Sequence, residues 1–222
     1  MSLNHFELNN CLTHRLIPSQ HSSPVLTDLF DDEDAAADIF SLEAATNRRM
    51  LAEADKLREL DKLDLVGRIP NGNVTNAAFC YPSPRGARFN TEERGAWYSS
   101  FVLETCIVEV SFHHWKNLQD AGFEHDTVTK DEYLATFDGR YHDMRELTDH
   151  KALHPDVDQA YPHGQILAQS ILAEDGLGII FNSLRHQGGT NMVCFHPSLV
   201  NRVVKGQSLT FEWGINPTPR VS

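Results

Sequence analysis

Two arginines that are far apart in the sequence, Arg15 and Arg88, have the side chain best suited to holding phosphate. A planar guanidinium donates two parallel hydrogen bonds to phosphate oxygens, so two converging arginines form a clamp for a pyrophosphate. The formal net charge of the chain is −12, yet a local basic pocket can bind a small anion on an acidic protein. The arginines of such a pocket must therefore converge in the fold.

Three further residues, Tyr98, Glu109 and Ser183, complete a set that suits cleavage of an N-glycosidic bond. Such cleavage passes through an oxocarbenium-like ribosyl centre, which a nearby carboxylate stabilises electrostatically. A tyrosine ring can stack on nicotinamide, and a serine hydroxyl can bond the carboxamide or the ribose. NAD⁺ contains both this bond and a pyrophosphate, so a site built from these residues suits NAD⁺ as a substrate and needs no metal and no prosthetic group.

The elements that position these residues follow from hydrophobic spacing. Residues 42–63 have the near-helical spacing of an amphipathic helix, which ends before the turn at Pro70-Asn71-Gly72. Two prolines in 82–86 predict a loop, and 96–98 predict a short strand. Ser99 or Ser100 is a suitable cap for a following helix. Its expected apolar face comprises Leu103, Cys106, Ile107 and Val110.

The second half of the chain alternates strands and helix in no regular order. Tyr133, Ala135 and Phe137 alternate as in a half-buried strand, and Ile166, Leu167 and Ile171 give 165–172 a helical spacing that Gly176 and Gly178 end. Short strands are expected at 178–181, 192–195 and 208–213. The mixed order predicts an α+β fold rather than a βαβ repeat. Gly188-Gly189 is only a pair, without the frame of a phosphate-binding loop.

Three segments resemble the RES-domain family. The clearest is Gly86-Ala-Arg-Phe-Asn, followed by Gly95-Ala-Trp-Tyr and by Leu103-Glu-Thr-Cys-Ile-Val-Glu-Val. A second is Gly178-Ile-Ile-Phe-Asn-Ser-Leu-Arg-His-Gln-Gly-Gly-Thr-Asn-Met-Val, which is similar to the serine block of the family. A third is His14-Arg15-Leu-Ile-Pro-Ser, which is similar to the arginine-bearing first strand.

The resemblance assigns the functional positions of the family. Its two arginines correspond to Arg15 and Arg88, its tyrosine to Tyr98, its glutamate to Glu109 and its serine to Ser183. Glu104 competes with Glu109 for the glutamate position, and Arg68 competes with Arg15 for the first arginine. His186 and Asn191 flank Ser183, where they either contact the ligand or cap the loop.

The resemblance also implies a fold and an activity. It implies one compact domain over 1–222 that is similar to ADP-ribosyltransferases, with short twisted sheets around a cleft. In this arrangement the N-terminal extension and helix, 1–70, pack onto a core formed by 71–222. RES proteins act as NAD⁺-degrading toxins that a partner antitoxin neutralises. Water as acceptor gives a glycohydrolase and inorganic phosphate gives a phosphorylase, and the sequence leaves open the acceptor, the antitoxin and the oligomeric state.

Composition excludes several other classes of function. The excess of acidic residues disfavours nucleic acid as a partner, because non-specific binding needs clustered lysine and arginine. No apolar run approaches the roughly 18 residues of a membrane helix, and the N-terminus lacks the features of a secretory signal, so we expect a cytoplasmic protein. The four cysteines are scattered without a CxxC pair, which argues against a zinc site and a disulfide scaffold.

Other interpretations of single residues remain. Adjacent residues on a helix point roughly 100° apart, so His113 and His114 rarely chelate one ion. Cys106 is a candidate nucleophile, but its apolar neighbours favour an inert buried thiol. Transfer of ADP-ribose to a macromolecule, or binding of NAD⁺ without turnover, are the alternative functions of the same set of residues.

Overall fold

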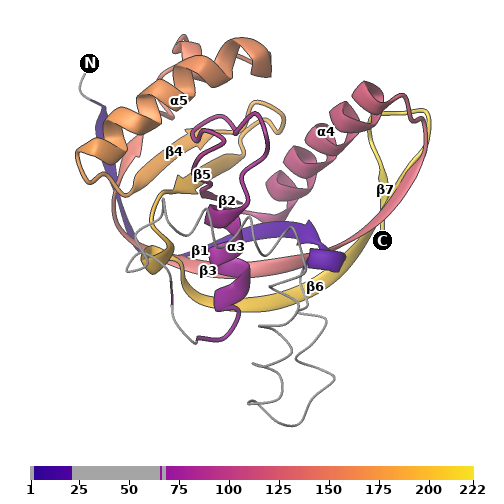
Figure 1. Cartoon of the computed structure of the whole chain (residues 1–222), viewed down its shortest axis with the longest axis horizontal. Helices are drawn as coiled ribbons and strands as arrows, with labels where there is room; N and C mark the ends of the chain where they lie inside the picture. The colour runs from indigo at the N-terminus through magenta and orange to yellow at the C-terminus, as the bar shows by residue number, and fades with distance from the viewer. Residues whose placement is uncertain (1–2, 22–65, 67–68) are drawn as a thin grey trace.

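Three long antiparallel strands form the base of the molecule. We describe residues 3–21, 66 and 69–222 of a computed structural model. β1 (Asn4–Pro18) pairs along its length with β3 (Asp126–Asp143), and β3 pairs on its other side with β6 (Asn201–Trp213). These strands curve together beneath the rest of the fold (Figure 1).

Four short strands complete a seven-stranded sheet, in the order β1-β2-β5-β4-β3-β6-β7 with an additional pairing of β1 with β3. Because β1 pairs with both β2 and β3, the first five strands of this order close on themselves. β2, β5 and β4 lie above the three long strands (Figure 1). The short strands are β2 (Trp97–Ser100), β4 (Gly178–Asn182), β5 (Thr190–Cys194) and β7 (Arg220–Val221).

Three α-helices of the described residues pack around this sheet. α3 (Gly72–Cys80) contacts β2, α4 (Leu103–Ala121) contacts β1 and β2, and α5 (Val157–Ala173) contacts β4 (Figure 1). α4 ends at Gly122, whose left-handed backbone lets its N–H bond the last carbonyls of the helix. Three short 3₁₀ helices connect the elements: η1 (Ser19–His21), η2 (Lys151–Leu153) and η3 (Pro197–Leu199).

The main core lies between the long strands and the short strands. Trp97 of β2 and the β3 residues Tyr133, Phe137 and Tyr141 are almost completely buried there. A second cluster fills the space between α5 and β4, and a third joins α4 to the ends of β3 and β6. The third cluster includes all four apolar residues expected on the first turns of α4, which confirms that face of the helix.

The fold confirms the expected α+β class in one domain, but several local predictions were wrong. Ser99 and Ser100 belong to β2, and Val102 is the N-cap of α4, because backbone pairing with β5 holds both serines in the strand. Ile166 is 67% exposed and does not face the core. The helix expected at 42–63 lies outside the described residues.

The N-terminal segment also differs from the expected extension packed onto a core of 71–222. β1 is a full partner of β3, with pairs running from Asn4 with Asp143 to Pro18 with Lys130, so it belongs to the sheet itself. α3 and β7 were not predicted, since a short helix and a two-residue strand carry little periodicity. Within the described residues, no helix is both long and apolar enough to span a membrane.

Candidate functional site

A cavity of about 610 Å³ opens between α4, the start of α5 and the edge of β1 and β2. Among the described residues that line it are six arginine and lysine side chains but only two carboxylates, those of Glu109 and Asp120. A protein with a net charge of −12 thus concentrates positive charge at one hollow. The six cationic residues are Arg15, Arg85, Arg88, Lys116, Lys130 and Arg185.

Glu109 is held in this cavity by two side chains from distant segments. One carboxylate oxygen, Oε1, accepts hydrogen bonds from the Ser183 hydroxyl at 2.6 Å and from the Asn191 amide at 2.7 Å. The Ser100 hydroxyl donates to the amide oxygen of Asn191 at 2.7 Å, which turns the NH₂ group toward Glu109. The second carboxylate oxygen has no hydrogen-bond partner among the described residues, so Glu109 is fixed in position with one oxygen left for a ligand.

The Ser183 hydroxyl is fully used within the protein. Besides donating to Glu109, it accepts the backbone N–H groups of Arg185 at 3.1 Å and His186 at 2.9 Å. His186 is hydrogen-bonded to Thr105 on the first turn of α4 at 2.8 Å, which ties this loop to the helix that carries Glu109. Ser183 itself does not line the cavity, so its direct contact is with Glu109. The expected contact of Ser183 with a ligand stays a prediction.

Tyr98 lines the cavity and fixes the loop that carries Arg88. Its hydroxyl donates to the Asn90 side chain at 3.0 Å and accepts the N–H of Phe89 at 2.8 Å. Burial raises the pKa of this hydroxyl, which stays protonated. Tyr98 thus lines the cavity and packs against the second core cluster, while its hydroxyl fixes Phe89 and Asn90 next to Arg88.

Arg88 reaches the same cavity from the loop before β2. Its Nη1 donates to the carbonyls of Ala152 at 2.5 Å and His154 at 3.2 Å. Burial lowers its pKa, while the nearby Tyr161 and Glu109 raise it. On the other side the backbone packs against Gly164 of α5, where a Cβ atom would overlap the carbonyl of Arg88. Loop and helix therefore set the position of this guanidinium together.

Arg15 enters the cavity from β1. Its Nη1 donates to the carbonyl of Tyr98 at 2.9 Å, and its guanidinium carbon lies 4.8 Å from the centre of the Trp97 ring. Its buried Nε has no hydrogen-bond partner within the described part of the chain, and burial lowers the pKa of Arg15 to about 10. A guanidinium held this way retains hydrogen-bonding capacity for an anion.

Arg185 is a residue of the cavity that the sequence did not reveal. Its guanidinium carbon lies 3.6 Å from the centre of the Phe112 ring, and its Nη2 donates to the carbonyl of Pro155. Burial lowers its pKa and the charge of Glu109 raises it, which places the two groups close together. Its position two residues after Ser183 was the available signal. Within the described part of the chain, no carboxylate forms a salt bridge with Arg185, Arg88 or Arg15.

The structure separates most of the competing candidates. Glu104 is exposed and lies outside the cavity that Glu109 lines. Arg68 lies outside the described residues. His113 lines the cavity, whereas His114 bonds Asp126 at 2.6 Å and stacks on Trp213, so the two histidines serve different contacts.

The thiol candidate is buried. Burial raises the pKa of Cys106 to about 12, which keeps it as an unreactive thiol at neutral pH. Cys80 and Cys194 are also buried, Cys11 is half-buried, and all four thiols are free.

The comparison with protein families decides the relationship. The RES domain matches residues 65–214, which is more than half of the chain. This chain belongs to the RES-domain family. The matched residues include Arg88, Tyr98, Glu109 and Ser183, but Arg15 precedes them. Arg15 is thus placed in the cavity by the structure, while its correspondence to the first arginine of the RES family stays a prediction.

Two further comparisons add less. No curated protein matches the chain. Among solved structures, the RES protein is similar to a chain in the crystal structure of the M. tuberculosis MbcT-MbcA toxin-antitoxin complex. The two share 18% sequence identity with a TM-score of 0.40, over 61% of this chain and 74% of that chain.

Proposed function

We propose that this RES protein cleaves the nicotinamide–ribosyl bond of NAD⁺. The observation that carries the proposal is the cavity in which Glu109, fixed by two hydrogen bonds, faces arginines with no carboxylate partner among the described residues. A cavity of about 610 Å³ has the size of small-molecule sites in general. Membership of the RES family makes the nicotinamide dinucleotide the first candidate ligand.

The proposed chemistry divides between charge and position. Arg15, Arg88 and Arg185 hold the pyrophosphate, because guanidinium groups pair with phosphate oxygens in two parallel hydrogen bonds. As the glycosidic bond breaks, its electron pair leaves with nicotinamide and the ribose becomes oxocarbenium-like. The carboxylate of Glu109 stabilises this positive centre, and its fixed position means that little reorganisation is needed during the reaction.

The remaining cavity residues orient the substrate. The Tyr98 ring provides an aromatic surface for nicotinamide, and the amide of Asn191 lies next to Glu109 at the ribose. Water as acceptor yields ADP-ribose, whereas inorganic phosphate yields ADP-ribose 1″-phosphate. By family membership we further propose that the protein is a cytoplasmic toxin that depletes NAD⁺ and that an antitoxin protein binds it.

Product analysis tests the proposal. Purified protein is incubated with NAD⁺, with and without phosphate, and nicotinamide and the ribosyl product are separated and quantified. We expect nicotinamide release, and the second product identifies the acceptor. Intact NAD⁺ in both mixtures contradicts the proposal, and radiolabel that becomes attached to a protein redirects it to ADP-ribosyl transfer.

Two variants on one helix separate the chemistry from the fold. Glu109→Gln keeps the shape of the side chain but removes its charge, so we expect nicotinamide release to fall by about 100-fold or more. Glu104→Gln is the matched control, since Glu104 is exposed on the same helix and does not line the cavity. Equal activity of the two variants removes Glu109 from the mechanism.

A further inference from the structure

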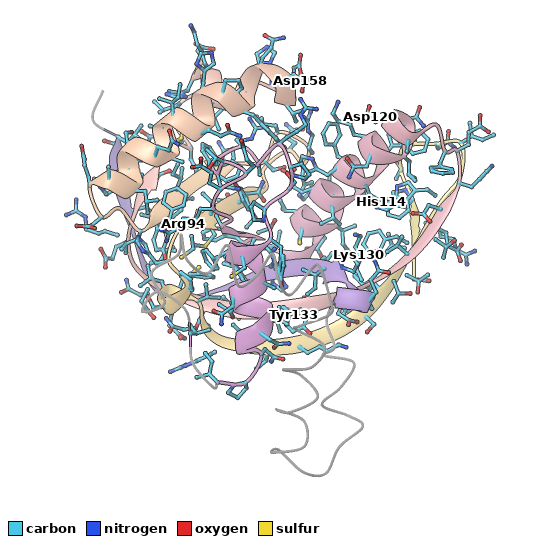
Figure 2. The ribbon with its side chains drawn as sticks, viewed as in Figure 1. Arg94, His114, Asp120, Lys130, Tyr133 and Asp158 are labelled. Atoms are coloured by element: carbon cyan, nitrogen blue, oxygen red, sulfur yellow. The ribbon has the colours of Figure 1, made fainter. Side chains whose placement is uncertain are left out.

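Lys130 is a buried cation that the proposed chemistry does not use. It belongs to β3, has only 6% of its surface exposed, and lines the cavity. Figure 2 shows it beneath α4, near the end of β1. Within the described residues, its ammonium group forms no hydrogen bond and no salt bridge.

The acidic residues near Lys130 on its own strand are engaged elsewhere. Asp126 bonds His114 at 2.6 Å, and Asp131 pairs with Lys205 at 2.7 Å. Glu132 pairs with His14 at 2.6 Å. None of these carboxylates forms a salt bridge with Lys130, although the charge of Asp126 raises its pKa. Burial of an ammonium without a partner is costly, and burial accordingly lowers the pKa of Lys130.

Arg15 lines the same cavity, and Pro18, three residues after Arg15 on β1, pairs with Lys130 on β3. Arg15 also has a buried Nε for which the described residues provide no hydrogen-bond partner. The cavity thus contains two buried cations with unused donors, and Asp120, an exposed residue of α4, is the carboxylate besides Glu109 that lines it among the described residues.

We propose that Lys130 forms an anion subsite of this cavity that binds a phosphate group. The anion supplies the hydrogen-bond acceptors that Lys130 lacks among the described residues, and a negative charge beside its ammonium group. The phosphate comes either from the dinucleotide or from free inorganic phosphate. The first source rests on the proposed function, whereas the second does not.

Calorimetric titration of the whole protein with two probes distinguishes the sources. ADP-ribose serves as the unreactive dinucleotide probe, and inorganic phosphate is titrated alone. Lys130→Met removes the charge and keeps most of the side-chain volume. Lys151→Met is the matched control, because Lys151 is an exposed lysine of η2 outside the cavity.

The expected result is a loss of affinity of about 10-fold or more in Lys130→Met, which corresponds to one charge-assisted hydrogen bond. Loss of ADP-ribose binding assigns the subsite to the dinucleotide, and loss of phosphate binding alone assigns it to free phosphate. Lys130→Arg retains binding. Unchanged affinity of Lys130→Met for both probes, or no binding of either probe to the natural protein, overturns the proposal.

Stability provides the second readout. A buried ammonium that serves only a ligand destabilises the unliganded fold, so Lys130→Met should unfold at the same or a higher urea concentration than the natural protein. A structural lysine predicts the opposite. If phosphate binding depends on Lys130 while NAD⁺ is not cleaved, the subsite stands and the proposed function fails. If Lys130→Met does not fold, the role of Lys130 is structural and the proposal is overturned. Lys130→Gln checks this result with a second uncharged side chain.

Discussion

Replacement of Ser183 by alanine should weaken both the fold and the site, because one hydroxyl makes three hydrogen bonds. The bond to the carboxylate of Glu109 is charge-assisted and contributes about 1.5–3 kcal/mol. The two bonds from the N–H groups of Arg185 and His186 are neutral and contribute about 0.5–1.5 kcal/mol each. Water can reach this part-buried loop and replaces some of the loss, so we expect Ser183→Ala to lower the free energy of unfolding by about 2–4 kcal/mol.

Urea denaturation measures this loss directly. The midpoint should fall while the slope of the transition stays constant, since the area exposed on unfolding is the same. Ser170→Ala is the matched control, because the Ser170 hydroxyl is exposed and donates only to the carbonyl of Leu167 within α5. Its effect should stay within about 0.5 kcal/mol.

A double-mutant cycle tests whether Ser183 acts through Glu109. Asn191 donates to the same oxygen of Glu109, so Ser183→Ala and Asn191→Ala should be non-additive by about 0.5–3 kcal/mol. In NAD⁺ turnover, Ser183→Ala should lower kcat more than it raises KM, since the carboxylate is displaced while the arginines remain. A stability loss below about 0.5 kcal/mol, together with additive effects in the cycle, refutes this reasoning.

Three other predictions follow from single contacts. Gly164→Ala should lower the free energy of unfolding by about 1–3 kcal/mol and raise the KM for NAD⁺, because the added Cβ overlaps the Arg88 carbonyl. The loss is expected although alanine favours a helix more than glycine does. Thermal unfolding that stays unchanged contradicts this prediction. Cys106→Ala should keep NAD⁺ turnover within about 3-fold of the natural protein, since the buried thiol is protonated. Complete loss of activity at full stability supports a thiol nucleophile instead. Burial and the neighbouring ring of His5 lower the pKa of His142, so the unfolded chain binds more protons and the free energy of unfolding should fall as the pH drops below about 6.5. His142→Gln should reduce this pH dependence in urea titrations at several pH values. An identical dependence in both proteins argues against the prediction.

The sequence by itself predicted the elements whose periodicity was strong. Alternation at Tyr133, Ala135 and Phe137 predicted β3, because successive residues of a strand face opposite sides of the sheet. Helical spacing from Leu103 to Val110 predicted the buried face of α4 for the corresponding reason. Family motifs then selected residues of the cavity, including Arg88, although nothing local shows that they meet.

The partners of these residues were decided only by the tertiary structure. Ser183 and Asn191 bond Glu109 across 74 and 82 residues of sequence, and the closure of β1 onto β2 and β3 brings these segments together. Lys130 has the sequence environment of a solvated lysine, yet α4 crosses above it and removes it from water. Periodicity encodes which side of an element is apolar, whereas the surroundings of a charge depend on segments that arrive from elsewhere in the chain.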